Sequence, residues 1–150
     1  MPRHRLESSI AFGVMDGTVT LLGVLLAMYA ISAPQHIVIT AILATAIADG
    51  IANAAGLHVS EEAMNHARHV VWKSTFTVFI ATFIVMCVPL IPIIFLDPPI
   101  SYAIAASIGL LFLFALGLTI QNWKFGIEYA AMGILAGGVC YIVSLLIPAS

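Results

Sequence analysis

Residues 12–23 read FGVMDGTVTLLG and place a carboxylate, Asp16, several helical turns inside a long membrane-compatible stretch. A charged side chain near the centre of a bilayer costs roughly 2.5 kcal/mol or more, so it usually faces a bundle interior, water or a bound cation. A second Asp-Gly pair occurs at Asp49-Gly50, inside another apolar stretch. The sequence therefore predicts that two deep carboxylates share one site within a membrane bundle.

The composition is that of an integral membrane protein. Of the 150 residues, 62% are hydrophobic and only 8% are charged, whereas roughly a quarter of the residues in soluble domains are charged. The basic residues are few and dispersed, which argues against binding to nucleic acid. No nucleophile and base stand at a catalytic spacing, so we expect neither an enzyme nor an organic cofactor.

Five continuous apolar runs, separated by short polar breaks, predict one all-α transmembrane domain over residues 1–150, embedded in a lipid bilayer. The predicted spans cover, to within a few residues, positions 9–31, 36–59, 73–96, 100–121 and 125–147. Pro89 and Pro92 lack backbone N–H donors and should kink the third of these spans. We expect an integral membrane bundle of five helices.

The basic residues predict the orientation of this bundle. All of them fall on the side of the membrane that holds the N-terminus: Arg3, Arg5, Arg68, Lys73 and Lys124. By the positive-inside rule this side is cytoplasmic. We therefore expect a cytoplasmic N-terminus.

The spans place Asp16 and Asp49 at similar depths, ~12–16 Å from the N-terminal side at 1.5 Å per residue. Thr20 shares a helix face with Asp16, and Asn53 shares one with Asp49, because each lies one turn away. Two neighbouring carboxylates repel when both are ionised, so we expect a proton or a cation between them. Metal binding would then expel a proton, and reprotonation would release the metal.

A second cluster of candidate metal ligands follows the second span. Four of its members recur at spacings of four, four and three residues, which predicts one face of a helix continuing from that span. Imidazole and carboxylate together suit Fe²⁺, Mn²⁺ or Zn²⁺. The four residues are His58, Glu62, His66 and His69, and Glu61 adjoins them. Two interpretations stay open: a metal-collecting site at the cytoplasmic mouth, or a solvated helix whose acids neutralise Arg68 and Lys73.

Glycines recur where helices are expected to approach closely. Gly13 and Gly17 form one small-xxx-small pair, and Gly133 and Gly137 form another, which is typical of helix packing in membranes. For Gly17 and Gly50, which adjoin the carboxylates, the missing side chain has a second interpretation. It would leave room for an ion or for water.

The order of these motifs resembles that of the vacuolar iron transporter family, which includes yeast and plant vacuolar importers of iron and manganese and many prokaryotic relatives. The resemblance rests on FGVMDG at residues 12–17, GIANAAGLHVS at residues 50–60 and MGILAGGVCYI at residues 132–142. It extends over nearly the whole chain. The long acidic insertion of the plant proteins is missing or reduced to residues 60–72, which is similar to a prokaryotic type of member.

The resemblance implies a homodimer with an ion path at its interface. It also implies export of Fe²⁺ or Mn²⁺ from the cytoplasm in exchange for protons, across a prokaryotic cytoplasmic membrane. Asp16 matches the family's membrane-embedded carboxylate, and Asn53 stands where the family usually has a methionine ligand. Asp49 stands where a small residue is usual.

Two functions of different class are therefore expected. The first is a homodimeric metal transporter with Asp16, Asp49 and Asn53 in its path. The second is a non-transporting membrane subunit for assembly or metal sensing, in which the aspartates fix the packing of helices.

Overall fold

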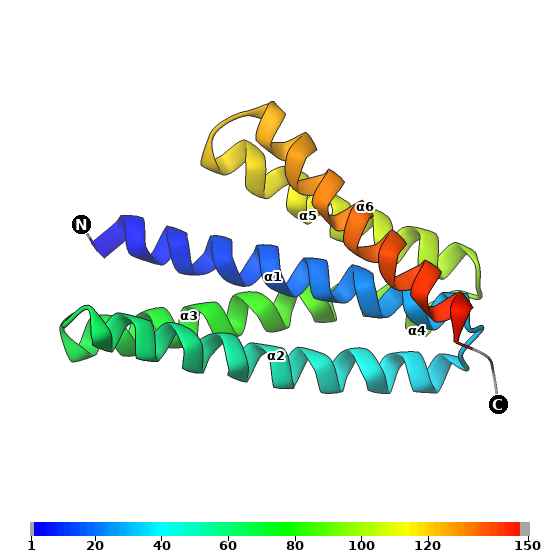
Figure 1. Ribbon diagram of the computed structural model, residues 1–150, viewed down its shortest axis with the longest axis horizontal. Helices are drawn as coiled ribbons and strands as arrows, with labels where there is room; N and C mark the ends of the chain where they lie inside the picture. Colours follow the sequence, from blue (N-terminus) through cyan, green and yellow to red (C-terminus); the bar gives the residue numbers. More distant parts are fainter. Residues whose placement is uncertain (1, 148–150) are drawn as a thin grey trace.

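The computed structural model describes the backbone of residues 2–147 and the side chains of residues 6–147. The side chains of Arg3 and Arg5, which contribute to the predicted orientation, lie outside the described residues. The structure consists of helices joined by short connections (Figure 1). They are α1 (Pro2–Ala30), α2 (Gln35–Ala63), α3 (Arg68–Cys87), α4 (Leu90–Phe95), α5 (Ile100–Ile120) and α6 (Trp123–Leu146).

Five helical segments are long and apolar enough to cross a membrane, which confirms the predicted all-α fold of an integral membrane protein. The segments are Leu6–Ala30, Gln35–Ala63, Arg68–Phe95, Ile100–Ile120 and Trp123–Leu146. The second and third extend beyond their predicted bounds into polar sequence. Hydropathy marks only the apolar part of a helix, whereas the backbone hydrogen bonds continue into its polar end turns.

The membrane-crossing segments alternate in direction (Figure 1). The N-terminus, the α2–α3 turn and the α5–α6 turn lie at one end of the bundle, and the end of α6 lies at the other. The start of α1 and the end of α6 therefore lie at opposite ends of the bundle. The same arrangement also brings Arg68 and Lys124 to the end that holds the N-terminus.

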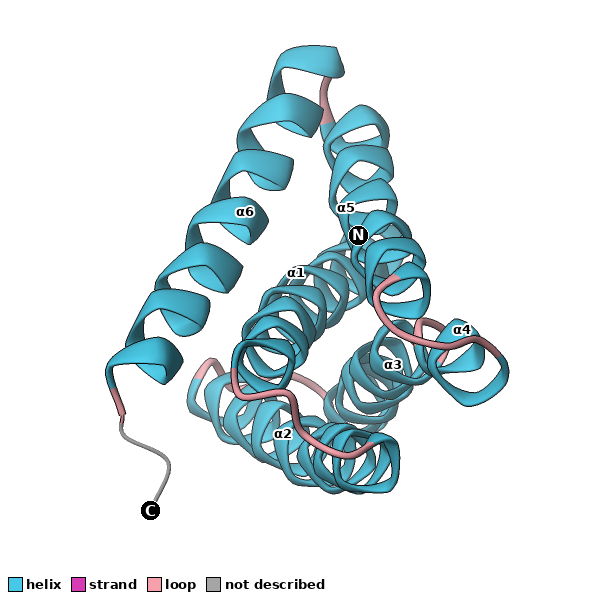
Figure 2. Ribbon diagram, turned by 90° about the vertical axis from the view of Figure 1, so that its right-hand side faces the viewer, coloured by secondary structure: helices cyan, strands magenta, loops and turns pink. Residues whose placement is uncertain are grey.

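The first helix, α1, is the centre of the bundle. Figure 2 shows α1 between the α2–α3 pair and the α5–α6 pair, and it contacts all four of these helices. Its glycines permit the approach of α3: a Cβ at Gly13 would lie 2.8 Å from the carbonyl oxygen of Val78, and one at Gly17 would lie 3.0 Å from that of Thr82. The small-xxx-small motif of α1 therefore serves helix packing.

The space expected beside Gly17 and Gly50 for an ion or water is absent, so that interpretation was wrong. The backbone of Thr82 fills the space at Gly17, and the ring of Phe79 lies 3.1 Å from the Cβ position of Gly50. Both glycines face α3. The glycines that follow the two aspartates therefore serve the contact with α3.

The prolines interrupt the third span, as predicted. Helix α3 ends at Cys87, and α4 begins at Leu90 after Pro89. The carbonyl groups at the end of α4 lack partners within the helix, and the side-chain amide of Gln35 donates to those of Ile93 and Ile94. The start of α2 thus caps the end of α4.

The tight contact between α1 and α3 predicts that Gly13→Ala destabilises the protein. Overpacking of this kind costs about 1–3 kcal/mol, and the gain in helix propensity offsets about 1 kcal/mol of it. Gly138→Ala is the matched control, because a Cβ at Gly138 would meet nothing within 4 Å. We expect a lower thermal unfolding temperature in detergent for Gly13→Ala only. Equal losses in the two variants would contradict this packing.

Candidate functional site

The two deep carboxylates lie together between α1 and α2, as the sequence predicts. Asp16 and Thr20 are one turn apart on α1, and Asp49 and Asn53 are one turn apart on α2. Because the two helices run in opposite directions, Asp16 meets Asn53 while Thr20 meets Asp49. The side-chain amide of Asn53 donates to Asp16 Oδ2 over 2.7 Å.

Asn53 joins three helices. Besides its bond to Asp16 on α1, the Asn53 amide nitrogen lies 3.4 Å from the hydroxyl oxygen of Thr82 on α3. Thr82 is fully buried in a long apolar run. Its role was not predicted, because a single threonine in such a run gives no periodic or charge signal. The amide oxygen of Asn53 remains as an acceptor for another group.

Asp49 has one carboxyl oxygen that remains unpartnered within residues 6–147. Its side chain neighbours those of Asp16 and Thr20. Its Oδ2 atom is buried and has no hydrogen-bond partner among the side chains that the structure describes. An unpaired carboxyl oxygen in a membrane interior is costly, so the site favours a proton or a cation beside it.

The donor atoms of this site are all oxygen. They come from Asp16, Thr20, Asp49 and Asn53, and oxygen ligands suit cations such as Mg²⁺ and Mn²⁺. Within residues 6–147, however, no three His, Cys, Asp or Glu side chains come together as a metal-binding group. The site within one chain thus holds two carboxylates, Asp16 and Asp49, and two neutral side chains, Thr20 and Asn53.

A row of small, exposed residues on α2 lies next to Asp49. Its members recur every four residues and follow one line along the helix: Ala44, Ala48, Ala52 and Gly56. A Cβ added at Gly56 would meet no atom within 4 Å. Small residues in such rows let membrane helices approach each other closely, so this face of α2 is suited to a neighbouring helix.

The predicted helical face of histidines and glutamate is wrong. Helix α2 ends at Ala63, and Asn65 adopts a positive φ of 55° that turns the chain toward α3. His66 therefore lies in the turn and His69 lies on α3. The polar residues that signalled a continuing helix instead reverse the chain, because asparagine tolerates the left-handed conformation.

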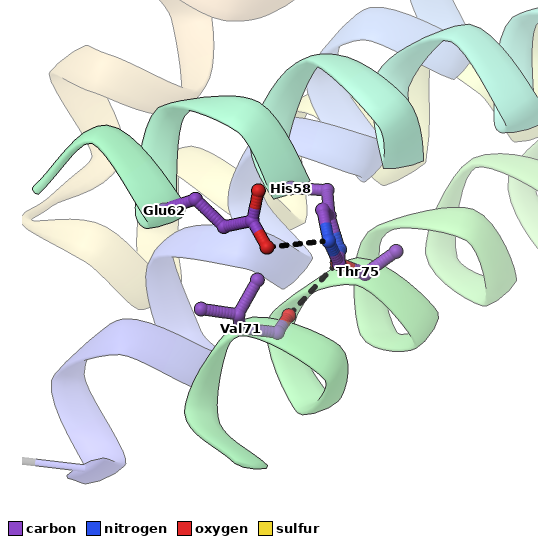
Figure 3. Close-up of polar contacts among 4 residues, drawn as sticks. All are labelled: His58, Glu62, Val71 and Thr75. Carbon is purple, nitrogen blue, oxygen red and sulfur yellow. Dashed lines mark hydrogen bonds and ion pairs between the residues drawn. The ribbon is translucent and has the colours of Figure 1, made fainter. Parts of the chain in front are cut away.

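These residues instead form separate contacts. His66 Nδ1 pairs with the carboxylate of Glu61, which is only 7% exposed. His58 Nε2 lies 3.3 Å from Glu62 Oε1, one turn further along α2. His58 Nδ1 lies 3.0 Å from the hydroxyl oxygen of Thr75 on α3. Figure 3 shows the side chains of Glu62, His58 and Thr75 at this place.

His58 and Asp49 face opposite sides of α2. They are nine residues apart, which at 3.6 residues per turn is two and a half turns. The contacts agree, because Asp49 neighbours Thr20 of α1 whereas His58 contacts Thr75 of α3. The predicted site residues therefore do not form one path with a mouth. They fall into three separate sets, with His69 apart on α3: Asp16, Asp49 and Asn53; His58 and Glu62; and Glu61 and His66.

No family model matches the sequence, and no curated protein or solved structure is significantly similar to the chain.

The bond from Asn53 to Asp16 predicts that Asn53→Leu destabilises the bundle. Hydrogen bonds between membrane helices contribute about 1–2 kcal/mol in model systems, and the substitution leaves the Asp16 carboxylate without its donor. Thr82→Val removes only the longer contact of 3.4 Å and should cost less. Chemical unfolding in mixed detergent measures both losses. An Asn53→Leu variant as stable as the unmodified protein would show that this bond is unimportant.

Proposed function

We propose that this membrane protein is a homodimeric transporter that moves a divalent transition metal, Fe²⁺ or Mn²⁺, out of the cytoplasm in exchange for protons. The observation that carries the proposal is the buried, unpaired Oδ2 atom of Asp49 beside Asp16. The resemblance of residues 12–17 and 50–60 to segments of the vacuolar iron transporter family supports the same function.

The neighbouring carboxylates supply a mechanism for exchange. Two ionised carboxylates at close range repel, so the pair holds a proton, a cation or both in turn. A divalent cation compensates both negative charges, and its binding to Asp16 and Asp49 displaces the proton. Reprotonation from the other side of the membrane then weakens the metal's ligands and releases it.

The type of donor favours Mn²⁺ or Fe²⁺ over softer metals. Asp16, Asp49, Thr20 and the amide oxygen of Asn53 are oxygen donors, whereas Cu⁺ and Zn²⁺ favour sulfur or imidazole. Asn53 stands where the family that this chain resembles usually has a methionine. An oxygen donor thus takes the place of a sulfur donor, which favours hard cations over soft ones. Between the two metals, an all-oxygen set suits Mn²⁺ better.

The homodimer completes the ligand set. Among the described residues, one chain brings only two carboxylates, Asp16 and Asp49, to this site. The row from Ala44 to Gly56 offers a face for a second copy. Contact through this row, which borders Asp49, would bring the carboxylates of both copies to one interface. The metal would then be held between the copies.

The second candidate is a non-transporting subunit for assembly or metal sensing. One observation favours it: the Asn53 amide links Asp16 of α1 to Thr82 of α3, which is how a polar residue stabilises a helix bundle. In this alternative Asp16 serves packing alone. Transport measurements separate the two functions.

In vesicles that contain the purified protein, Asp16→Asn and Asp49→Asn should each reduce Mn²⁺ uptake driven by a proton gradient at least roughly tenfold. Loss even of groups that only orient metal ligands costs 10–100-fold in affinity. Asp97→Asn, an exposed carboxylate near the opposite end of the bundle, is the control. Unchanged uptake in both site variants rules out the carboxylate mechanism. Absence of any metal movement in the unmodified protein favours the non-transporting subunit.

In a background with Cys87 and Cys140 replaced by Ala, Ala52→Cys should form a disulfide between copies in native membranes. Symmetric packing along the small-residue row would bring the two introduced thiols together. Ile80→Cys, at an exposed position on α3, is the matched control. Cross-linking is read as a dimer band on a non-reducing gel. Equal cross-linking at Ile80, or none at Ala52, would contradict this interface.

A further inference from the structure

The contacts of His58 determine which of its nitrogens carries hydrogen. The hydroxyl of Thr75 donates its single hydrogen to the backbone carbonyl oxygen of Val71 over 2.8 Å. It can then only accept from His58 Nδ1, 3.0 Å away. When the imidazole is neutral, its hydrogen is therefore on Nδ1, and the lone pair is on Nε2, the nitrogen that lies beside Glu62 (Figure 3).

The Nε2 atom of His58 faces another hydrogen-bond acceptor, the carboxylate of Glu62. His58 Nε2 lies 3.3 Å from Glu62 Oε1, one helical turn along α2. A neutral imidazole nitrogen and a carboxylate oxygen both accept, so they do not bond to each other directly. They require a shared proton or a cation between them.

We propose that His58 Nε2 and the Glu62 carboxylate bind a divalent first-row cation at the end of α2 next to the α2–α3 turn. Imidazole and carboxylate are the ligands that such cations accept, and the Nδ1–H bond to Thr75 orients the ring as metal-bound histidines require. The Glu62 side chain is 59% exposed, so water completes the coordination.

This site is separate from the acid pair and does not depend on the proposed transport. His58 faces α3, whereas Asp49 lies on the opposite side of α2, next to α1. The neighbouring acid Glu61 takes no part, because its carboxylate is buried and contacts His66. Thr75 is a positioning residue, since it acts through the ring of His58.

Trp72 supplies a direct readout of metal at this site. Its indole ring lies against His58, with ring centroids 4.7 Å apart. A bound Co²⁺ ion would quench its fluorescence. Trp123→Phe removes the second tryptophan of the chain, so that the remaining emission comes from Trp72 alone.

The test is a titration of the full-length Trp123→Phe protein with Co²⁺ in detergent. We expect saturable quenching, and we expect His58→Gln and Glu62→Gln each to weaken it roughly tenfold or more. His69→Gln is the matched control and should have no effect. Because Glu62 is exposed, its variant tests the site even if His58→Gln does not fold.

Thr75 variants test the orientation of the ring. Thr75→Val, which loses the acceptor for Nδ1–H, should weaken Co²⁺ binding several-fold, at the low end of the 10–100-fold range for such partners. Thr75→Ser should restore it. If Thr75 had only a structural role, Thr75→Val and Thr75→Ser proteins of equal thermal stability would bind Co²⁺ with equal affinity.

Three results would overturn the proposal. They are absence of saturable quenching, quenching in His58→Gln and Glu62→Gln as strong as in the parent Trp123→Phe protein, and equal effects of Thr75→Val and Thr75→Ser. The first would mean that His58 and Glu62 are a plain ion pair. Adding Asp16→Asn separates this site from the proposed function: Co²⁺ quenching should persist in that variant even where transport is lost.

Discussion

A carboxylate inside a membrane needs a hydrogen-bond donor, a proton or a cation, and this requirement governs how α1 and α2 meet. Asp16 has its donor in the amide of Asn53, 2.7 Å away. Asp49 is left with a buried oxygen that has no partner among the described side chains. The glycines of α1 bring α3 close enough for Thr82 to join the same network. Helix packing and the candidate ion site therefore depend on the same few residues.

The polar groups of α2 divide between its two sides. Asp49 neighbours α1, whereas His58 contacts Thr75 of α3, nine residues further along. This geometry argues against a single continuous path from the α2–α3 turn to Asp16 and Asp49. A cation held by His58 and Glu62 would instead lie on the flank of the bundle, where it can affect the contact between α2 and α3 without occupying the acid site.

Much of the fold follows from the sequence, because membrane spans and intramembrane charge are strong signals. Hydropathy predicted five helices, and counting residues along antiparallel spans correctly brought Asp16 and Asp49 together. The prediction that the histidines share one helix face was wrong. The residues of the turn at 64–67 are as polar as those of an exposed helix, so polarity alone does not distinguish the two. Thr82 and Thr75 were missed as well. Isolated hydroxyls in apolar runs acquire partners only through tertiary packing.

The most direct test of the carboxylate site is the position of bound Mn²⁺ in crystals of the full chain, located by its anomalous scattering. We predict Mn²⁺ beside Asp16 and Asp49, between two copies of the chain related by twofold symmetry. Mn²⁺ only beside His58 and Glu62, or acid pairs that lie far apart in the dimer and bind no ion, would contradict the account.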